Sequence, residues 1–390
     1  MKRKTTPSQL LWLIAIFFVA VNLRPIITSI GPLFNVLLDE LPSTNTKVSL
    51  LTSIPVFCMG LFAPLAFPLT RKFPTIIMPM LLAMIAIATI LRAILPTYSI
   101  LLLTSFIAGT AIAIIGPIMN ARIKAQFKER TASALGVYSF GIGVGATLSA
   151  SFSFAIYEQT SWSIALGSWG ILGIIAVVLW VAIAGEETLT QIAPQETARN
   201  PWRQKEAWLI LLFFGLQTAL FFSFMTWLSP LAVAQGFSLQ EAGYLLMAFS
   251  AIQMLGNLAI PWLVERYFTP IIWLTFLSSL TLIGLLLFAL TSGVWLWLGV
   301  LLIGLMLSGL FPLGLLLPLN AAKNDTEANT WSSMVLSGGF MLSAILPLLI
   351  GLVIDQTNQP SLAYVIFGSI IIIMQLIIWA LSRTTKGFNS

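Results

Sequence analysis

An arginine lies within a long apolar stretch near the start of the sequence. The stretch reads VNLRPIITSIGP and lies between the runs LLWLIAIFF and LFNVLL. Arg24 is 16 residues after Ser8 and 15 residues before Asp39, about 24 Å and 22 Å along a helix. The long apolar runs on both sides indicate a membrane-spanning segment, and a side chain this deep in it does not easily reach either water layer. Burying arginine there costs about 2.5–3.5 kcal/mol, which some interaction must offset.

A carboxylate would be the usual partner of a buried arginine, yet each of the 13 acidic residues falls in a predicted loop or at the end of an apolar segment. We therefore expect Arg24 to be an unpaired cation in a central cavity. Its planar fork suits carboxylate, nitro or linear-anion acceptors. Pro25 removes the helical bond to the Val21 carbonyl and is expected to open the helix locally. The alternative is that Arg24 bonds freed carbonyls and braces the first span.

Polar and aromatic residues near the middle of other predicted spans are candidates for the same cavity. The predicted substrate-binding residues are Arg24, Asn22, Tyr138, Gln217, Trp227, Gln253 and Asn257. Each of the six added to Arg24 is about as well explained by bonding between helices, which is common in membranes. Trp227, toward the outer end of its span, would stack on a flat ligand or close the outer mouth. Arg92, about three residues from the outer end of its span, is expected to reach the interface as an anchor.

The composition excludes several kinds of chemistry. The chain has no histidine, which removes the usual metal ligand, general base and pH switch. Its one cysteine, Cys58, excludes an internal disulfide and a cysteine-rich metal site. No catalytic residue, metal site or cofactor is therefore predicted. The run from Gly141 to Gly145 lacks the G-x-G-x-x-G spacing of a nucleotide loop, and its small-xxx-small spacing favours close helix packing.

The chain of 390 residues is 58% hydrophobic and only 8% charged, whereas soluble domains are about 25% charged. This composition predicts a multi-pass membrane protein, with the lipid bilayer as its surroundings. The net charge of +6 lies in short loops, so it does not indicate nucleic-acid binding. The apolar run after MKRK continues to about Leu38, which is too long for a signal peptide, so we expect a retained first span.

Apolar segments of roughly 20 residues are long enough to cross the hydrocarbon layer. Twelve such segments are predicted, at 10–38, 48–69, 75–95, 98–121, 131–155, 162–184, 207–233, 241–264, 270–290, 294–318, 329–354 and 361–381. With the N-terminus inside, the inner segments hold every basic residue except Arg24, Lys47 and Arg92. The positive-inside rule therefore predicts that both termini are cytoplasmic, in the cell membrane.

The longest polar stretch, residues 185–206, divides the predicted spans six from six. The two halves also resemble each other: WLIAIFF begins at Trp12 and WLILLFF begins at Trp208, an offset of 196 residues. Arg71 and Arg266 are related by almost the same offset, and so are Gly143 and Gly339. We therefore predict an all-α membrane protein of twelve transmembrane helices in two pseudo-symmetric six-helix bundles, 1–184 and 207–390, joined by a cytoplasmic linker. Parallel repeats of this kind place the binding site between them, near the membrane midplane.

Four strings carry a resemblance to a known family. They are NLRPxxTSxGP in the first span, LLTSIPVFCMGLFAP in the second, WLSPxxxxxGFSxxxAGY from Trp227 to Tyr244, and GLFPLGLLLP from Gly309 to Pro318. On these strings the chain resembles the cyanate/2-nitroimidazole permeases of the major facilitator superfamily, over nearly its whole length. The loop signature G-x-x-x-D-x-x-G-R-[RK] is reduced here to PLTRKF. The resemblance implies the major facilitator fold and transport of a small solute.

The resemblance and the lone arginine together predict a transporter for a small anionic or strongly dipolar solute, such as a cyanate-like anion or a nitroimidazole-like compound. Alternating access around Arg24 is the expected mechanism, and one chain is expected to act as a monomer. Two alternatives stay open: a carrier that exports xenobiotics, and a membrane-embedded enzyme. The aspartate-rich metal motif or catalytic histidine expected of such an enzyme is absent from the sequence.

Overall fold

The computed structural model describes residues 9–127, 130–183, 200–267, 269–322 and 324–384, and within these ranges the regular structure is helical. Eleven helical segments of this described part are long and apolar enough to cross a membrane. Helix α12 (Leu239–Arg266), with 28 residues, is the twelfth long helix. Each of the twelve predicted spans therefore coincides with a helical segment, which confirms the predicted fold class.

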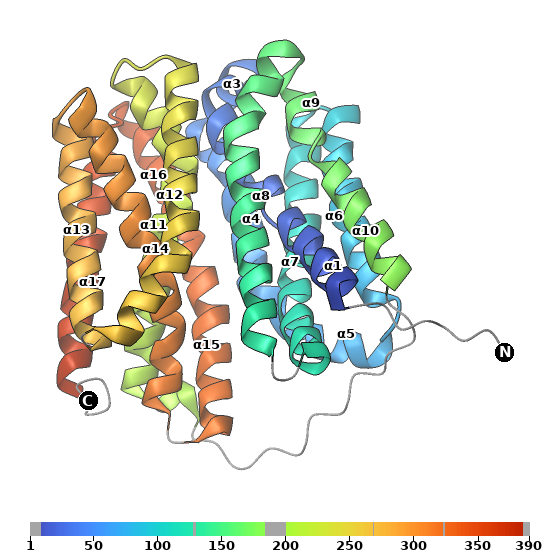
Figure 1. The fold of residues 1–390 in the computed structure, drawn as a ribbon. Helices are drawn as coiled ribbons and strands as arrows, with labels where there is room; N and C mark the ends of the chain where they lie inside the picture. Colours follow the sequence, from blue (N-terminus) through green and yellow to red (C-terminus); the bar gives the residue numbers. More distant parts are fainter. Residues whose placement is uncertain (1–8, 128–129, 184–199, 268, 323, 385–390) are drawn as a thin grey trace.

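The helices form two groups that stand side by side in Figure 1, blue to green for the N-terminal half and yellow-green to red for the C-terminal half. The first group contains α1 (Gln9–Asn22), α2 (Pro25–Thr28), η1 (Gly31–Leu33), α3 (Phe34–Glu40), α4 (Asn45–Phe62), η2 (Ala63–Leu65), α5 (Ala66–Lys72), α6 (Ile77–Ile94), α7 (Tyr98–Phe127), α8 (Thr131–Gln159), α9 (Trp162–Gly167) and α10 (Gly170–Ile183). We call this group the N-terminal bundle.

The second group, the C-terminal bundle, contains η4 (Pro201–Arg203), α11 (Lys205–Ala234), α12, α13 (Pro270–Leu290), α14 (Val294–Ala321), α15 (Asp325–Ser343), α16 (Ile345–Thr357) and α17 (Leu362–Thr384). Residues 185–199 of the predicted linker lie outside the described residues. In Figure 1, α1 begins and α17 ends toward the lower end of the molecule, whereas α3 lies at the upper end. We call the upper end, which carries the turn at 41–44, the distal end.

The first span is broken in its middle, and Pro25 explains where. Pro25 has no N–H, so the carbonyl of Val21 lacks its helical donor, and α1 ends at Asn22. A second helical turn, α2, begins at Pro25 with Arg24 as its N-terminal cap. This confirms the expected opening of the helix. Arg24 thus lies at the centre of a 32-residue span, in a break between two helices.

Helix α8 packs closely against this broken segment. A Cβ atom at Gly145 of α8 would lie 2.1 Å from the carbonyl oxygen of Val21, so only glycine allows this approach. At Gly141 an added Cβ would lie 2.9 Å from the carbonyl oxygen of Phe17. The small-xxx-small spacing therefore packs α8 against α1, as predicted, because helices in lipid associate through such close contacts.

Candidate functional site

Arg24 lies where the N-terminal bundle faces the C-terminal bundle. Its guanidinium carbon is 5.4 Å from the ring centroid of Phe222 and 5.9 Å from that of Phe221, both on α11. These distances are within the range of cation–π attraction. The side chain keeps partial access, yet its Nη1 atom is buried and has no hydrogen-bond partner among the described residues. A buried donor of this kind is costly unless a ligand or water bonds it.

Tyr138 of α8 is the predicted residue that the structure brings near Arg24. Its side chain is buried, and the phenol and the guanidinium are close enough to interact electrostatically. The guanidinium is thus bordered by a phenol from the N-terminal bundle and two phenyl rings from the C-terminal bundle. Polar groups where two such bundles meet are well placed to contact a bound molecule.

Two predicted amides are buried but are not seen to contact Arg24. The Asn22 side-chain oxygen faces α10, where a Cβ added to Gly173 would lie 3.2 Å from it. Its Nδ2 atom has no partner among the described residues. Gln217 of α11 donates through Nε2 to the hydroxyl of Thr218 over 2.6 Å, while its Oε1 atom is buried and without a partner in the described part. Both residues therefore keep free bonding capacity in the interior.

The predicted residues of α12 lie beside the contact between the bundles. Gln253 is half-buried and Asn257 is exposed, and the spacing of four residues places them on one face of the helix. Their neighbour Met254 packs over Gly143 of α8, with its Cγ atom 3.0 Å from an added Cβ. The structure thus places this pair beside the line along which α12 and α8 meet.

Trp227 lies away from Arg24, toward the distal end. Its ring packs on Phe34 of α3, with centroids 4.6 Å apart. Its Nε1 atom donates to the carbonyl oxygen of Pro347 over 3.0 Å, and the side chain is fully buried. Nearby, an added Cβ at Gly31 would lie 2.1 Å from the Met225 carbonyl oxygen, so the two bundles touch closely here. Trp227 therefore belongs to the closed distal contact.

A carboxylate joins the bundles at the same end. Asp355, near the end of α16, accepts hydrogen bonds of 2.9 Å from the backbone N–H groups of Asn45 and Thr46, the first two residues of α4. It also accepts from the Asn45 amide over 2.9 Å and from the Thr46 hydroxyl over 2.6 Å. Free N–H groups at a helix N-terminus favour an anion, so Asp355 caps a helix of the opposite bundle.

Arg92 corrects one expectation from the sequence. It does not extend to the membrane interface but is fully buried within the N-terminal bundle. Its Nη1 donates to the Ile26 carbonyl over 2.9 Å, its Nε to the Thr104 hydroxyl over 3.1 Å, and its Nη2 to the Ser105 hydroxyl over 2.7 Å. The reason is helix direction. Arg92 is near the C-terminus of α6, and helical side chains point toward the N-terminus, which here means into the membrane.

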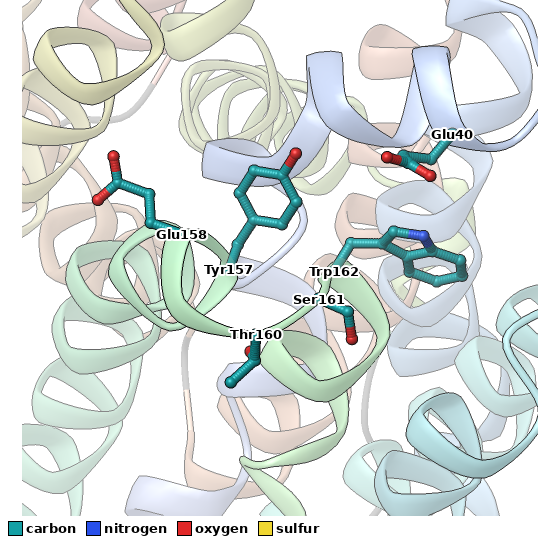
Figure 2. Close-up of a pocket in the computed structure, with 6 residues that line it drawn as sticks. All are labelled: Glu40, Tyr157, Glu158, Thr160, Ser161 and Trp162. Atoms are coloured by element: carbon teal, nitrogen blue, oxygen red, sulfur yellow. The ribbon is translucent and has the colours of Figure 1, made fainter.

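A separate cavity of about 370 Å³ opens at the distal end (Figure 2). It is lined by Glu40 of α3, by Tyr157 and Glu158 of α8, and by Thr160, Ser161 and Trp162 at the start of α9. None of the predicted site residues lines it. Its two carboxylates, Glu40 and Glu158, have a charge opposite to that of Arg24.

Sequence reasoning missed Phe221 and Phe222, although a signal for them was present. The internal offset of 196 residues maps Arg24 onto residue 220, so the two phenylalanines lie at the matching depth of the other bundle. Hydropathy alone could not separate them from the many lipid-facing aromatic residues. The repeat would have identified them, because repeats related by symmetry meet at equivalent depths.

Comparison with known proteins finds a matching family and several relatives. The sequence model of the Major Facilitator Superfamily matches residues 11–344. The uncharacterized transporter YycB of Bacillus subtilis (strain 168) is 28% identical over 374 residues, covering 94% of this chain and 92% of that protein. The cyanate transport protein CynX of Escherichia coli (strain K12) is 27% identical over 347 residues, covering 86% and 88%. The 2-nitroimidazole transporter of the same organism is 24% identical over 374 residues, covering 91% of each chain.

Solved structures share the fold at lower identity. The nucleoside transporter NupG superposes with a TM-score of 0.75 at 13% identity, over 97% of this chain and 99% of that one. A bacterial homolog of the human lysosomal transporter Spinster, in an inward-facing and unoccupied conformation, gives a TM-score of 0.78 at 15% identity, over 98% of each chain. These likenesses concern the fold alone.

Proposed function

Because this chain belongs to the Major Facilitator Superfamily, and is thus a multi-pass membrane transporter, we propose that its solute is a small molecule bearing anionic, nitro or carboxylate oxygens. The main observation behind this proposal is that the Nη1 atom of Arg24 is a buried donor without a partner in the described part of the chain. A charged hydrogen bond contributes about 1.5–3 kcal/mol, so a solute oxygen that accepts from Arg24 gains much of its affinity there.

The surroundings of Arg24 favour a flat aromatic solute among this class. Phe221 and Phe222 face the guanidinium, and their rings lie 5.1 Å apart. A planar ring can stack on phenylalanine while its nitro or carboxylate oxygens bond the guanidinium. Two distant relatives are named for cyanate and 2-nitroimidazole transport. Both compounds carry oxygens suited to Arg24, and the second also carries a ring.

Alternating access would follow from the position of Arg24 between the bundles. We propose that the solute binds near Arg24, that the distal contact around Trp227 and Asp355 opens and closes, and that a single chain forms the whole site. The basic inner segments support cytoplasmic termini in the cell membrane. We propose that transport is driven by facilitated diffusion, by anion exchange or by movement of the solute's own proton. The reason is that the central residues named above include no histidine or carboxylate that could carry a coupled proton. Uptake into liposomes driven by a pH gradient, for a solute without a titratable proton, would contradict this energetics.

The test of binding is a thermal-shift titration of the purified chain with 2-nitroimidazole and with sodium cyanate. Imidazole, which lacks the nitro group, is the matched control compound. A ligand at 100 times its Kd stabilises the folded state by about 2.7 kcal/mol, so a clear rise in Tm is expected. Arg24→Gln should abolish that rise. Arg71→Gln, which removes an exposed arginine on α5, should leave it unchanged. Equal shifts in wild type and Arg24→Gln would contradict the proposed site.

The alternative function, export of xenobiotics, is also supported by the two phenylalanines beside Arg24, Phe221 and Phe222. A xenobiotic carrier would bind neutral aromatic compounds as well as nitro compounds. In the same titration, imidazole and 2-nitroimidazole would then shift Tm equally, and Arg24→Gln would retain both shifts.

A further inference from the structure

The short helix α2, which follows Arg24, leaves one of its carbonyl groups without a helical donor. In an α-helix the N–H of Ile30 would bond the carbonyl of Ile26. Here the Ile30 N–H bonds the Ile27 carbonyl instead, over 3.4 Å. The Ile26 carbonyl is buried in the bundle, so it needs a donor from elsewhere.

Arg92 supplies that donor from α6. Its Nη1 atom lies 2.9 Å from the Ile26 carbonyl oxygen. Its other two nitrogen positions bond the hydroxyls of Thr104 and Ser105 on α7, and Ser105 in turn donates to the Leu51 carbonyl of α4 over 3.2 Å. One guanidinium therefore ties the broken first span to α6, α7 and α4. Lysine cannot reproduce this arrangement, because its three donors diverge from one nitrogen atom.

The turn that Arg92 holds is the turn that carries Arg24. The Arg24 carbonyl accepts from the N–H groups of Ile27 and Thr28, each over 3.0 Å, and from the Thr28 hydroxyl over 2.9 Å. The Thr28 hydroxyl also bonds the Ser149 hydroxyl of α8. The segment from Arg24 to Thr28 is thus a single hydrogen-bonded unit fixed at two points. A shift of its Ile26 carbonyl would move the Cα atom of Arg24 with it.

We propose that Arg92 is a positioning residue for solute binding, which acts by fixing the turn that presents Arg24 to the C-terminal bundle. This inference rests on the proposed role of Arg24. Binding groups must be held close to their productive geometry by such supporting residues, and a break in a helix provides little stiffness of its own. Arg92 supplies the stiffness at a point two residues from the group that binds.

The test is a double-mutant cycle on the affinity for 2-nitroimidazole, with Arg92→Lys, Arg24→Lys and the double variant. If Arg92 acts through Arg24, Arg92→Lys weakens binding about tenfold when Arg24 is native, and less than about twofold in the Arg24→Lys background. A brace that stabilises the bundle in general would weaken binding by the same factor in both backgrounds, and that result would overturn the inference.

Arg122→Lys is the matched control. Arg122 is also a buried arginine of the N-terminal bundle whose Nη2 bonds a backbone carbonyl, that of Pro74, over 2.9 Å. This variant should lower Tm without changing the affinity. If Arg92→Lys does not fold, Ser105→Ala removes one support of Arg92 and should weaken binding about threefold beside Arg24 only. If Arg24→Gln retains the affinity for 2-nitroimidazole, the proposed function is refuted. If Arg24→Gln loses that affinity but the effects of Arg92→Lys and Arg24→Lys are additive, only the role of Arg92 is refuted.

Discussion

Arg24 and Arg92 are both arginines of the N-terminal bundle, but the hydrogen-bond donors of their side chains are satisfied in different ways. Neither has a carboxylate among the interactions that the structure shows for it. Arg92 bonds three oxygens with all three of its nitrogen positions. Arg24 keeps a buried donor without a partner in the described chain and faces aromatic rings instead. Carbonyl and hydroxyl oxygens are therefore enough to hold an arginine that has a structural task.

The location of each arginine explains the difference. Arg92 bonds only elements of its own bundle, so its contacts would persist in the proposed movement of the two bundles. Arg24 faces α11 of the opposite bundle, so a permanent bond across that boundary would resist the motion. In the proposed mechanism, the open donor of Arg24 bonds a solute in one step of the cycle and water in another.

The largest effect that would test this comparison is on stability. Arg92→Leu should lower the free energy of unfolding by about 2 kcal/mol, because hydrogen bonds between membrane helices contribute about 0.6 kcal/mol each and the Ile26 carbonyl becomes unsatisfied. Arg24→Leu should leave stability unchanged or raise it, because it removes a charged group whose buried Nη1 donor has no partner in the described chain. Thermal unfolding of the two variants in the same detergent measures both. Equal losses of stability would show that Arg24 is also a brace.

A second prediction concerns Asp355, a side chain whose hydrogen bonds cross the boundary between the bundles. Asp355→Asn removes the charge and one acceptor from the four bonds that reach Asn45 and Thr46. The loss of charge-assisted bonds, about 1–2 kcal/mol, should shift the equilibrium about tenfold toward a state with the distal end open. The stability of each bundle should change little, because the bonds join the two bundles.

Labelling kinetics can follow that opening. Cys58 is the one cysteine of the chain and is replaced by Ala first. Leu246→Cys then reports on the distal contact, because Leu246 is fully buried and an added Cβ at Gly31 would lie 3.1 Å from its Cδ2 atom. Asp355→Asn should increase the maleimide labelling rate about tenfold, whereas Glu158→Gln, a change of charge at the same end, should not. An unchanged rate in Asp355→Asn would mean that other contacts hold the distal end closed.

The sequence predicted the fold far better than the contacts of the site. Hydropathy locates spans because their length is set by the bilayer, and Pro25 marked the break in the first span. Hydropathy does not say which face of a span meets which neighbour, so Arg92 was placed at the interface and Phe221 and Phe222 were missed. Asp355 was assigned only to the end of a span, since a bond to residues some 310 positions away is set by tertiary packing.

The smallest expected effect concerns the rings that distinguish Arg24 from Arg92. Phe222→Leu should weaken binding of 2-nitroimidazole about two- to fivefold, because leucine keeps the apolar contact and loses only the aromatic stacking, about 0.5–1 kcal/mol here. Cyanate has no ring, so its affinity should change by less than about twofold. Phe224→Leu on the same helix is the matched control, since its ring stacks on Phe367 with centroids 4.4 Å apart. It should lower Tm and leave both affinities unchanged. If Phe222→Leu weakens both ligands equally, the ring orients Arg24 and does not contact the solute, and the aromatic preference of the site would have to be abandoned.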